Sequence, residues 1–202
     1  DTGAGNDIIA ASAGFDAING GAGLDTVTFA QSRAGFVFTP NGSGLVTLSK
    51  PGGGVDTLEG VERIKFADMG VALDVDGNGG QTYRVYQAAF DRKPDAGGLG
   101  FWMFNMDRGM SLEQVAAGFM DSKEFRDLYG ADPTAEQFVG KLYNNVLHRA
   151  PDAGGLDFWV QALQNGASRA EVLVQFSESA ENTSALAEII GSGFFYQTIW
   201  PV

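Results

Sequence analysis

The amino-acid sequence predicts an α+β protein in which a β-rich part precedes a helical part. Three observations predict this order: a nine-residue repeat rich in glycine and aspartate opens the chain, short alternating apolar segments follow, and the second half repeats itself with helical spacing. We expect a parallel β-roll with a β cap over residues 1–80, a duplicated all-α bundle over 81–188 and an apolar tail over 189–202.

Composition limits the classes of function. The 202 residues allow one or two domains, and a hydrophobic content of 44% is enough for a core. The formal charge of −12 argues against nucleic-acid binding, because nucleic acid attracts basic surfaces. The lack of cysteine excludes disulfides and thiolate metal sites. No apolar run is long enough to span a membrane, and no N-terminal signal peptide is recognisable.

The first three nine-residue units, residues 2–10, 11–19 and 20–28, place the same residue types at the same positions. The recurring glycines and aspartates are the predicted metal ligands: Gly5, Asp7, Gly14, Asp16, Gly23 and Asp25. Glycine allows a tight turn with positive φ, and aspartate supplies the oxygen that Ca²⁺ prefers. The pattern is typical of calcium-binding parallel β-rolls. The alternative is a glycine-rich loop whose acidic residues are in phase by chance.

These units resemble the RTX (repeats-in-toxin) family of bacterial proteins, which leave the cell by type I secretion. In that family a turn shares Ca²⁺ with the turn two units along the chain. The resemblance therefore implies one ion between Asp7 and Asp25, completed by carbonyl groups of the same turns. By this rule Asp16 has no downstream partner, because residues 29–37 contain no aspartate.

The resemblance also implies an extracellular or cell-surface protein whose partners are calcium and the type I secretion apparatus. Ca²⁺ is scarce in the cytosol, so we expect the acidic turns to stay open during export and to fold on Ca²⁺ outside the cell. Because the chain begins within a repeat, we expect it to continue a longer protein, with any catalytic domain upstream of Asp1.

Short strand-like segments follow at residues 35–39 and 44–49, separated by a turn cluster at 40–44. Residues 55–68 alternate apolar and polar side chains, and their D-T-L-x-G-V-E-x-I-x-F-x-D pattern resembles the segment that closes many RTX rolls. We expect this segment to cap the roll. Its acidic residues are expected to be solvated or part of the cap: Asp56, Glu59, Glu62 and Asp68.

Residues 74–79 match the opening of an EF-hand loop. Val85 stands where such a loop needs a glutamate, so a complete EF-hand is excluded. Two interpretations remain: an acidic turn between domains, or a weak calcium site formed by Asp74, Asp76 and Asn78.

The second half is a duplication. Residues 86–124 align with 143–181 at a constant offset of 57 without a gap, and 16 of the 39 positions are identical. Glycines at 109 and 166 are expected to end the tryptophan-bearing helices, and serines at 111 and 168 to begin the next ones through capping boxes. The Asp-Pro pair at 132–133 predicts another helix start. Together these signals predict a bundle of about six helices.

Each copy contains the motif R-x-P-D-A-G-G-L-x-F-W, which begins at Arg92 and at Arg149. In one interpretation, Arg92 pairs locally with Asp95, and Asp95 caps the helix that carries Trp102. In the other, the two motifs flank a shared groove where tryptophan faces stack on a sugar or peptide. The motif pair resembles a bacterial helical family called domain of unknown function 4214, which implies an extracellular binding or assembly module without established catalytic residues.

We expect no enzymatic activity. His148 is the only histidine, so a zinc site is nearly excluded, and no G-x-S-x-G motif occurs. Two functions stay open: a calcium-binding module that attaches to a cell-surface glycan or protein, or the export and folding end of a secreted enzyme. The charge-free tail is expected to pack on the bundle, to act as an uncleaved secretion signal, or both.

Overall fold

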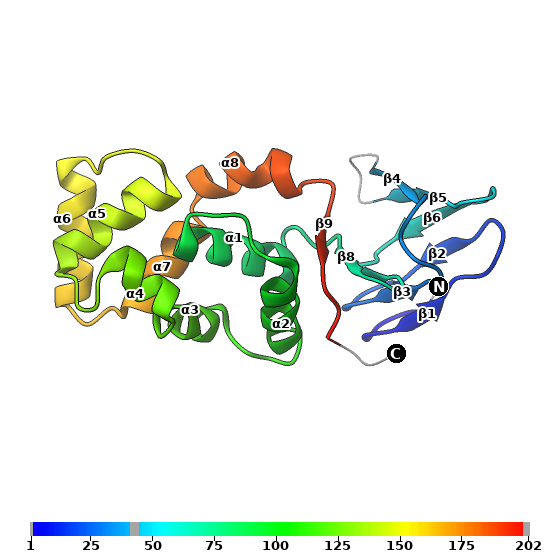
Figure 1. Ribbon diagram of the computed structural model, residues 1–202, viewed down its shortest axis with the longest axis horizontal. Helices are drawn as coiled ribbons and strands as arrows, with labels where there is room; N and C mark the ends of the chain where they lie inside the picture. Colours follow the sequence, from blue (N-terminus) through cyan, green and yellow to red (C-terminus); the bar gives the residue numbers. More distant parts are fainter. Residues whose placement is uncertain (1, 41–44, 200–202) are drawn as a thin grey trace. The chain divides into compact units, whose positions relative to one another are not determined.

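The computed structural model describes residues 2–40 and 45–199 (Figure 1). Most of the predicted turn cluster, residues 41–44, and the last part of the predicted tail, 200–202, lie outside the described residues. The α+β prediction is confirmed: two mixed β-sheets are followed by eight helices within the described part. The chain divides into a β unit, formed by residues up to Gly79 together with those from Ile189, and a helical unit, Gly80–Glu188.

The β unit contains two sheets. One has the strand order β1-β3-β7-β8-β9, and the other has the order β2-β6-β5-β4. The strands are β1 (Ile8–Ala10), β2 (Ala17–Asn19), β3 (Thr26–Thr28), β4 (Val37–Pro40), β5 (Val46–Ser49), β6 (Val55–Glu59), β7 (Arg63–Lys65), β8 (Gly70–Ala72) and β9 (Phe194–Tyr196). Successive repeats therefore alternate between the sheets, so that the first and third repeats pair while the second pairs with β6.

The repeated aliphatic position forms the core of the β unit. Parallel register places Val27 between Ile9 and Ile64 in the first sheet, and Ile18 beside Leu58 in the second. Val27 and Ile64 are fully buried, and Leu58 is 1% exposed. These side chains pack inward as predicted, because alternate residues of a strand point to the same face.

The sheets are mixed rather than wholly parallel. The hairpin β4–β5 interrupts the repeat series, and β5 pairs with β6 in the antiparallel sense. Strands β8 and β9 are also antiparallel to their neighbours. The structure thus shows the β content and the repeat pairing, while the finer assignment to a calcium-binding β-roll belongs to the proposal below.

The C-terminal strand joins the β unit. Phe195 in β9 pairs with Val71 in β8, and Phe194 is buried. The guanidinium of Arg33 lies 4.8 Å from the ring centroid of Phe195. The expectation that the tail packs on the helical bundle is therefore wrong for this strand. Strand β8 offers an unpaired sheet edge, which β9 covers by backbone hydrogen bonds.

The helical unit repeats its elements at the offset seen in the sequence. The helices are α1 (Asn78–Phe90), α2 (Ala96–Met106), α3 (Leu112–Met120), α4 (Lys123–Tyr129), α5 (Ala135–Val146), α6 (Ala153–Gln164), α7 (Arg169–Ser177) and α8 (Ala180–Ile190). The prediction of about six helices missed α4 and α8. The sequence contains a signal for α4, namely the serine at position 122. Ser122 is the N-cap of α4 and accepts a hydrogen bond from the Phe125 N–H. None of the described helices is long and apolar enough to cross a membrane.

Most of the predicted helix ends are confirmed. Ser111 and Ser168 form capping boxes, and Gly109 and Gly166 have φ of 97° and 101°. The helix start at residues 132–133 is wrong by a short distance. Thr134 is the N-cap of α5 and forms a capping box with Gln137, which satisfies two end groups where Asp132 would satisfy one.

Candidate functional site

Three carboxylates line up where the turns of the first sheet stack, and we call Asp7, Asp25 and Glu62 the first acidic edge. These acids are the residues just before β1, β3 and β7. Extending the strand register by one residue toward the N-terminus places Asp7 beside Asp25 and Asp25 beside Glu62. The Asp7 N–H donates to Asp25 Oδ1 at 2.9 Å, and the Asp25 N–H donates to Glu62 Oε2 at 2.8 Å. The carboxylates of Asp25 and Glu62 thus each accept a hydrogen bond from the preceding turn, which holds the three acids in one row.

Among the described residues no basic side chain forms an ion pair with Asp7 or Asp25, although the nearby Arg63 guanidinium donates to the Glu62 carbonyl at 3.1 Å. Asp25 is fully buried, and its Oδ2 atom, like Oδ2 of Asp7, has no hydrogen-bond partner in the described structure. Burial raises the pKa of Glu62, and the charges of Asp25 and Asp74 raise it further. Buried anionic oxygens without partners are costly unless a proton or a cation compensates them.

Glycines let the backbones of the stacked turns approach each other closely in the repeats that carry these acids. A side-chain carbon added at Gly21 would lie 1.8 Å from the Gly3 oxygen, and one at Gly23 would lie 2.1 Å from the Gly5 oxygen. Both glycines have positive φ, 89° and 141°. The repeat therefore needs glycine here for contact between backbones as well as for the turn itself.

Any cation at this edge would depend on such carbonyls. In residues 2–40 and 45–199, no three His, Asp or Glu side chains form a group that could hold a metal ion. Ca²⁺ accepts carboxylate and backbone carbonyl oxygens alike, in six- to eightfold coordination. A donor set of a pair of carboxylates together with turn carbonyls therefore fits Ca²⁺ better than a metal that needs nitrogen or sulfur.

The opposite turns carry a second acidic edge, formed by Asp16 and Asp56. The Asp16 N–H donates to Asp56 Oδ1 at 3.0 Å, as the equivalent groups do at the first edge. The sequence-based expectation that Asp16 lacks a partner is therefore wrong, since Asp56 returns to it after the β4–β5 hairpin. Here a cation is present: Lys50 Nζ lies 2.7 Å from Asp56 Oδ1 and 3.2 Å from Asp16 Oδ2.

Two acids of the predicted cap segment belong to the acidic edges. Asp56 was expected to be solvated or part of the cap, and the first alternative is wrong because Asp56 is fully buried. Glu62 occupies the aspartate position of the first acidic edge. A signal for Asp56 existed, because Asp56-Thr-Leu repeats the Asp25-Thr-Val pattern. Glu62 gave no such signal, since a glutamate replaces the aspartate there.

The acidic turn at residues 74–79 is tied to the fold. Asp74 forms an ion pair with the buried Arg63, and its Oδ2 accepts the Gly79 N–H at 2.8 Å at the start of α1. Asp76 is exposed, and Asn78 is the first residue of α1. These contacts fit the interpretation as a structural turn, because Asp74 already has a cationic partner.

The R-x-P-D motifs have structural partners in both copies. Asp95 and Asp152 cap α2 and α6 by accepting the N–H groups of Gly98 and Gly155 at 2.7 and 2.8 Å. The predicted local pairs of the arginines with these aspartates are present, and each arginine also binds a closer glutamate across the unit. Arg92 pairs with Glu124 at 2.6 Å and Arg149 with Glu181 at 2.8 Å, whereas the local aspartates lie 3.7 and 3.8 Å away.

The tryptophans and the histidine of the duplication also have local roles. Trp102 packs edge-to-face on Phe119, and Trp159 packs at a tilt on Phe176, with ring centroids 5.0 and 5.3 Å apart. His148, with φ of 52°, lies just beyond the C-cap of α5, and its counterpart Asp91 has φ of 48°. The lone histidine thus occupies a left-handed helix-end position that the duplication repeats.

Comparison with protein-family models identifies the family of the helical unit. The family model described as Domain of unknown function (DUF4214) matches residues 82–129 and 116–186. The first match covers most of α1 with α2 to α4, and the second runs from α3 into α8. No curated protein matches the chain significantly.

Proposed function

Because the chain belongs to the DUF4214 family through its duplicated helical half, we propose that it is a calcium-folded module of a secreted or cell-surface bacterial protein. In this proposal an RTX-type β-roll binds Ca²⁺ outside the cell after type I export, and the DUF4214 duplication follows it. The observation that carries the proposal is the first acidic edge, where the fully buried Asp25 has an unpartnered carboxylate oxygen beside that of Asp7.

Asp7 and Asp25 would hold the ion, with Glu62 and the carbonyl groups of the stacked turns as further oxygen donors. Bound Ca²⁺ would supply a positive charge beside Asp7 and Asp25. Without it, the repulsion between neighbouring carboxylates disfavours the closed turns. A ligand that binds only the folded state stabilises it by about 2.7 kcal/mol at one hundred times its Kd, which is a large share of a typical domain stability.

The test is a calcium titration of the wild type by isothermal calorimetry, with far-UV circular dichroism and thermal melting in Ca²⁺ and in EGTA. We expect binding, a gain of β signal and a higher melting temperature in Ca²⁺. Asp25→Asn should lose these effects. Asp157→Asn, which removes the same charge from an exposed position on α6, should keep them. Equal calcium responses in all three proteins would refute the site.

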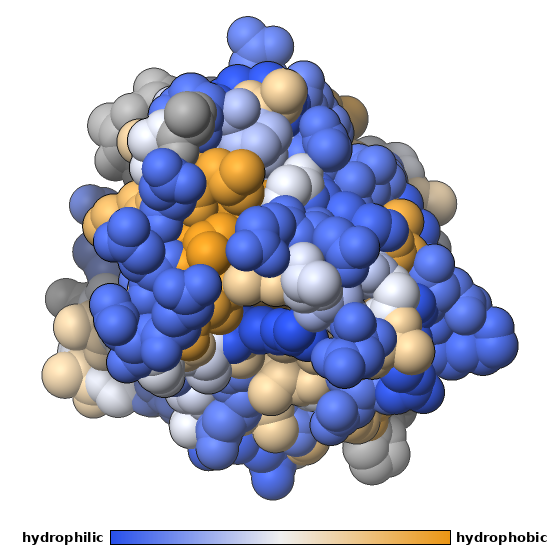
Figure 2. Space-filling model, turned by 90° about the vertical axis from the view of Figure 1, so that its left-hand side faces the viewer, coloured by the Kyte–Doolittle hydropathy of each residue, from blue (hydrophilic) through white to orange (hydrophobic). Residues whose placement is uncertain are grey.

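Attachment to a surface ligand is the proposed role of the helical unit. Phe101 and Phe158 stand at equivalent positions and are 49% and 62% exposed, each edge-to-face with the adjacent tryptophan. Figure 2 shows apolar side chains gathered in a strip between hydrophilic ones on one face. Exposed aromatic rings are suited to stacking on sugars or apolar peptide groups.

A glycan array and a cell-retention assay would test this role. Binding and retention that fall in the Phe101→Ala, Phe158→Ala double variant would support attachment. No binding and no retention would favour the second candidate, the export and folding end of a secreted enzyme whose catalytic domain lies upstream. Neither candidate assigns a catalytic residue to this chain.

A further inference from the structure

Lys50 occupies a position in the β unit that resembles a cation site. The side chain follows β5 and reaches the turn of the second repeat, where its Nζ donates to the Ser12 carbonyl at 2.8 Å. The other two contacts of Nζ are the carboxylates of Asp16 and Asp56, at 3.2 and 2.7 Å. An ammonium group has three hydrogens, so these three oxygens use its full donor capacity.

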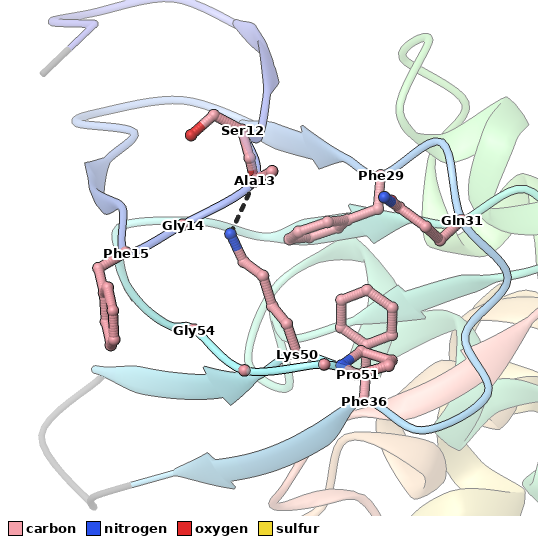
Figure 3. Close-up of a pocket in the computed structure, with 12 residues that line it drawn as sticks. Ser12, Ala13, Gly14, Phe15, Phe29, Gln31, Phe36, Lys50, Pro51 and Gly54 are labelled. Carbon is pink, nitrogen blue, oxygen red and sulfur yellow. Dashed lines mark hydrogen bonds between the residues drawn. The ribbon is translucent and has the colours of Figure 1, made fainter.

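The Lys50 ammonium is enclosed. The lysine side chain is 8% exposed, and the side chains of Asp16 and Asp56 are 25% and 0% exposed. Figure 3 shows the side chain lying between the loop of residues 12–15 and the turn of residues 51–54. These residues line a hollow of about 530 Å³, and the lysine occupies the part of it beside the two carboxylates.

The two acidic edges share one backbone arrangement, although Asp16 also accepts hydrogen bonds from the N–H and Oγ of Ser12. At each edge, the backbone N–H of one aspartate donates to the carboxylate of the acid in the next paired turn, at 2.9 Å for Asp7 and 3.0 Å for Asp16. The second edge has Lys50, whereas no ion pair in the described structure involves Asp7 or Asp25. The same backbone arrangement thus occurs once with an internal cation and once without.

We propose that Lys50 is a covalently attached replacement for Ca²⁺ at the second acidic edge, so that the roll takes up calcium at the first edge alone. Removal of the lysine charge should convert Asp16, Asp56 and the Ser12 carbonyl into an additional Ca²⁺ site. Calcium uptake at the first edge rests on the proposed function. The replacement of calcium by Lys50 at the second edge depends only on the contacts of Lys50.

The geometry agrees with a permanent ion pair, because both carboxylates lie within 3.2 Å of Lys50 Nζ. Since the lysine belongs to the chain, this edge can close at any calcium concentration. An intramolecular partner acts at an effective concentration on the order of millimolar.

The charge of Asp74 is compensated in a similar way. Its ion pair with Arg63 joins two elements of the β unit, β7 and the turn before α1. Of the predicted calcium ligands, Asp16 and Asp74 thus have a basic side chain as partner. Of the remaining three acids, Asp76 is exposed, whereas Asp7 and Asp25 have buried oxygens without partners, so an added cation would have the largest effect at these two.

The experiment compares calcium stoichiometry in the wild type, Lys50→Met and Lys50→Met/Asp56→Asn. We expect Lys50→Met to bind one more Ca²⁺ per chain than the wild type, to lose β signal in EGTA and to regain it in Ca²⁺. The double variant should not gain the ion. Lys123→Met is the control, because Lys123 is 83% exposed in the helical unit and should leave the stoichiometry unchanged.

Stoichiometry also separates the two proposals. A wild type that binds no calcium, together with a Lys50→Met variant that binds one ion, would refute the first-edge site and support the role of Lys50. Unchanged stoichiometry in Lys50→Met, or a loss of β signal that millimolar Ca²⁺ does not restore, would overturn the role of Lys50.

The enclosure of Lys50 can also be measured in the wild-type protein, from the rate at which its lysines are acetylated. Pulse acetylation followed by mass spectrometry should label Lys50 more slowly than Lys123, equally in EGTA and in Ca²⁺. Labelling of Lys50 as fast as Lys123, or labelling that rises when Ca²⁺ is added, would show that the lysine does not hold the second acidic edge.

Discussion

Phe119→Leu should destabilise the helical unit more than Phe176→Leu, although the two positions are equivalent in the duplication. Both side chains are buried, at 2% and 3% exposure. Phe119 lies among three rings, those of Tyr86, Phe90 and Trp102, with each centroid 5.0 Å from its own. It thus joins α3 to both α1 and α2.

Phe176 has fewer ring neighbours. Its ring lies 5.0 Å from Tyr143 and 5.3 Å from Trp159, and Leu147 stands at the position that Phe90 has in the first copy. Leucine has fewer side-chain carbons than phenylalanine, and at about 0.8 kcal/mol per buried carbon each variant should lose about 2 kcal/mol. The additional aromatic pair at Phe119 should make its loss larger by about 0.5–1.5 kcal/mol.

Urea unfolding followed by helical circular dichroism at 222 nm would measure both losses. The midpoints convert to free energies of unfolding provided that the two variants keep the wild-type denaturant slope. Each variant serves as the control of the other, because the substitution is the same. Equal losses, or a larger loss in Phe176→Leu, would refute the idea that ring pairs distinguish the two copies.

Two further predictions concern the β unit. In calcium-free buffer, Glu62→Gln should raise the stability of the β unit at neutral pH and have no effect well below pH 4.5. The pKa of Glu62 is raised in the folded state, so stability that is present below its ordinary pKa of 4.5 is lost as the pH rises. Melting at several pH values in EGTA would measure this, and a variant that melts below the wild type at neutral pH would contradict it. Gly21→Ala should destabilise the β unit more than Gly52→Ala, although both glycines have positive φ. The new carbon would meet the Gly3 oxygen at 1.8 Å at position 21 and nothing within 4 Å at position 52. The control, Gly52→Ala, should lose about 1–2 kcal/mol from the left-handed backbone alone, and equal melting temperatures of the two variants would argue against stacked turns.

Local signals made much of the fold predictable. The capping boxes at Ser111 and Ser168 depend on residues three apart in the chain, and both are present. The repeated aliphatic position predicted that Ile9 and Val27 lie side by side in the core, because successive units of the repeat adopt the same local conformation. The caps Asp95 and Asp152 were likewise readable from the sequence that follows them.

Non-local pairings were harder to predict. The partner of Asp16 is Asp56. The β4–β5 hairpin separates the two in the sequence, so the spacing of the nine-residue repeat does not predict their pairing. Arg92 binds Glu124, a residue of α4, and α4 itself was not predicted. Charged side chains such as these have many candidate partners within reach, so spacing along the chain does not select one.

The pairing of β9 with β8 makes the β unit discontinuous in sequence, with the helical unit as an insertion between its two parts. The ladder between Val71 and Phe195 therefore closes a loop that contains all of the duplication. Contacts of such long sequence separation form late in folding. The edge of the sheet at β8 can therefore be paired only after the whole helical insertion has been synthesised, so the first strands of the β unit wait for a strand made much later.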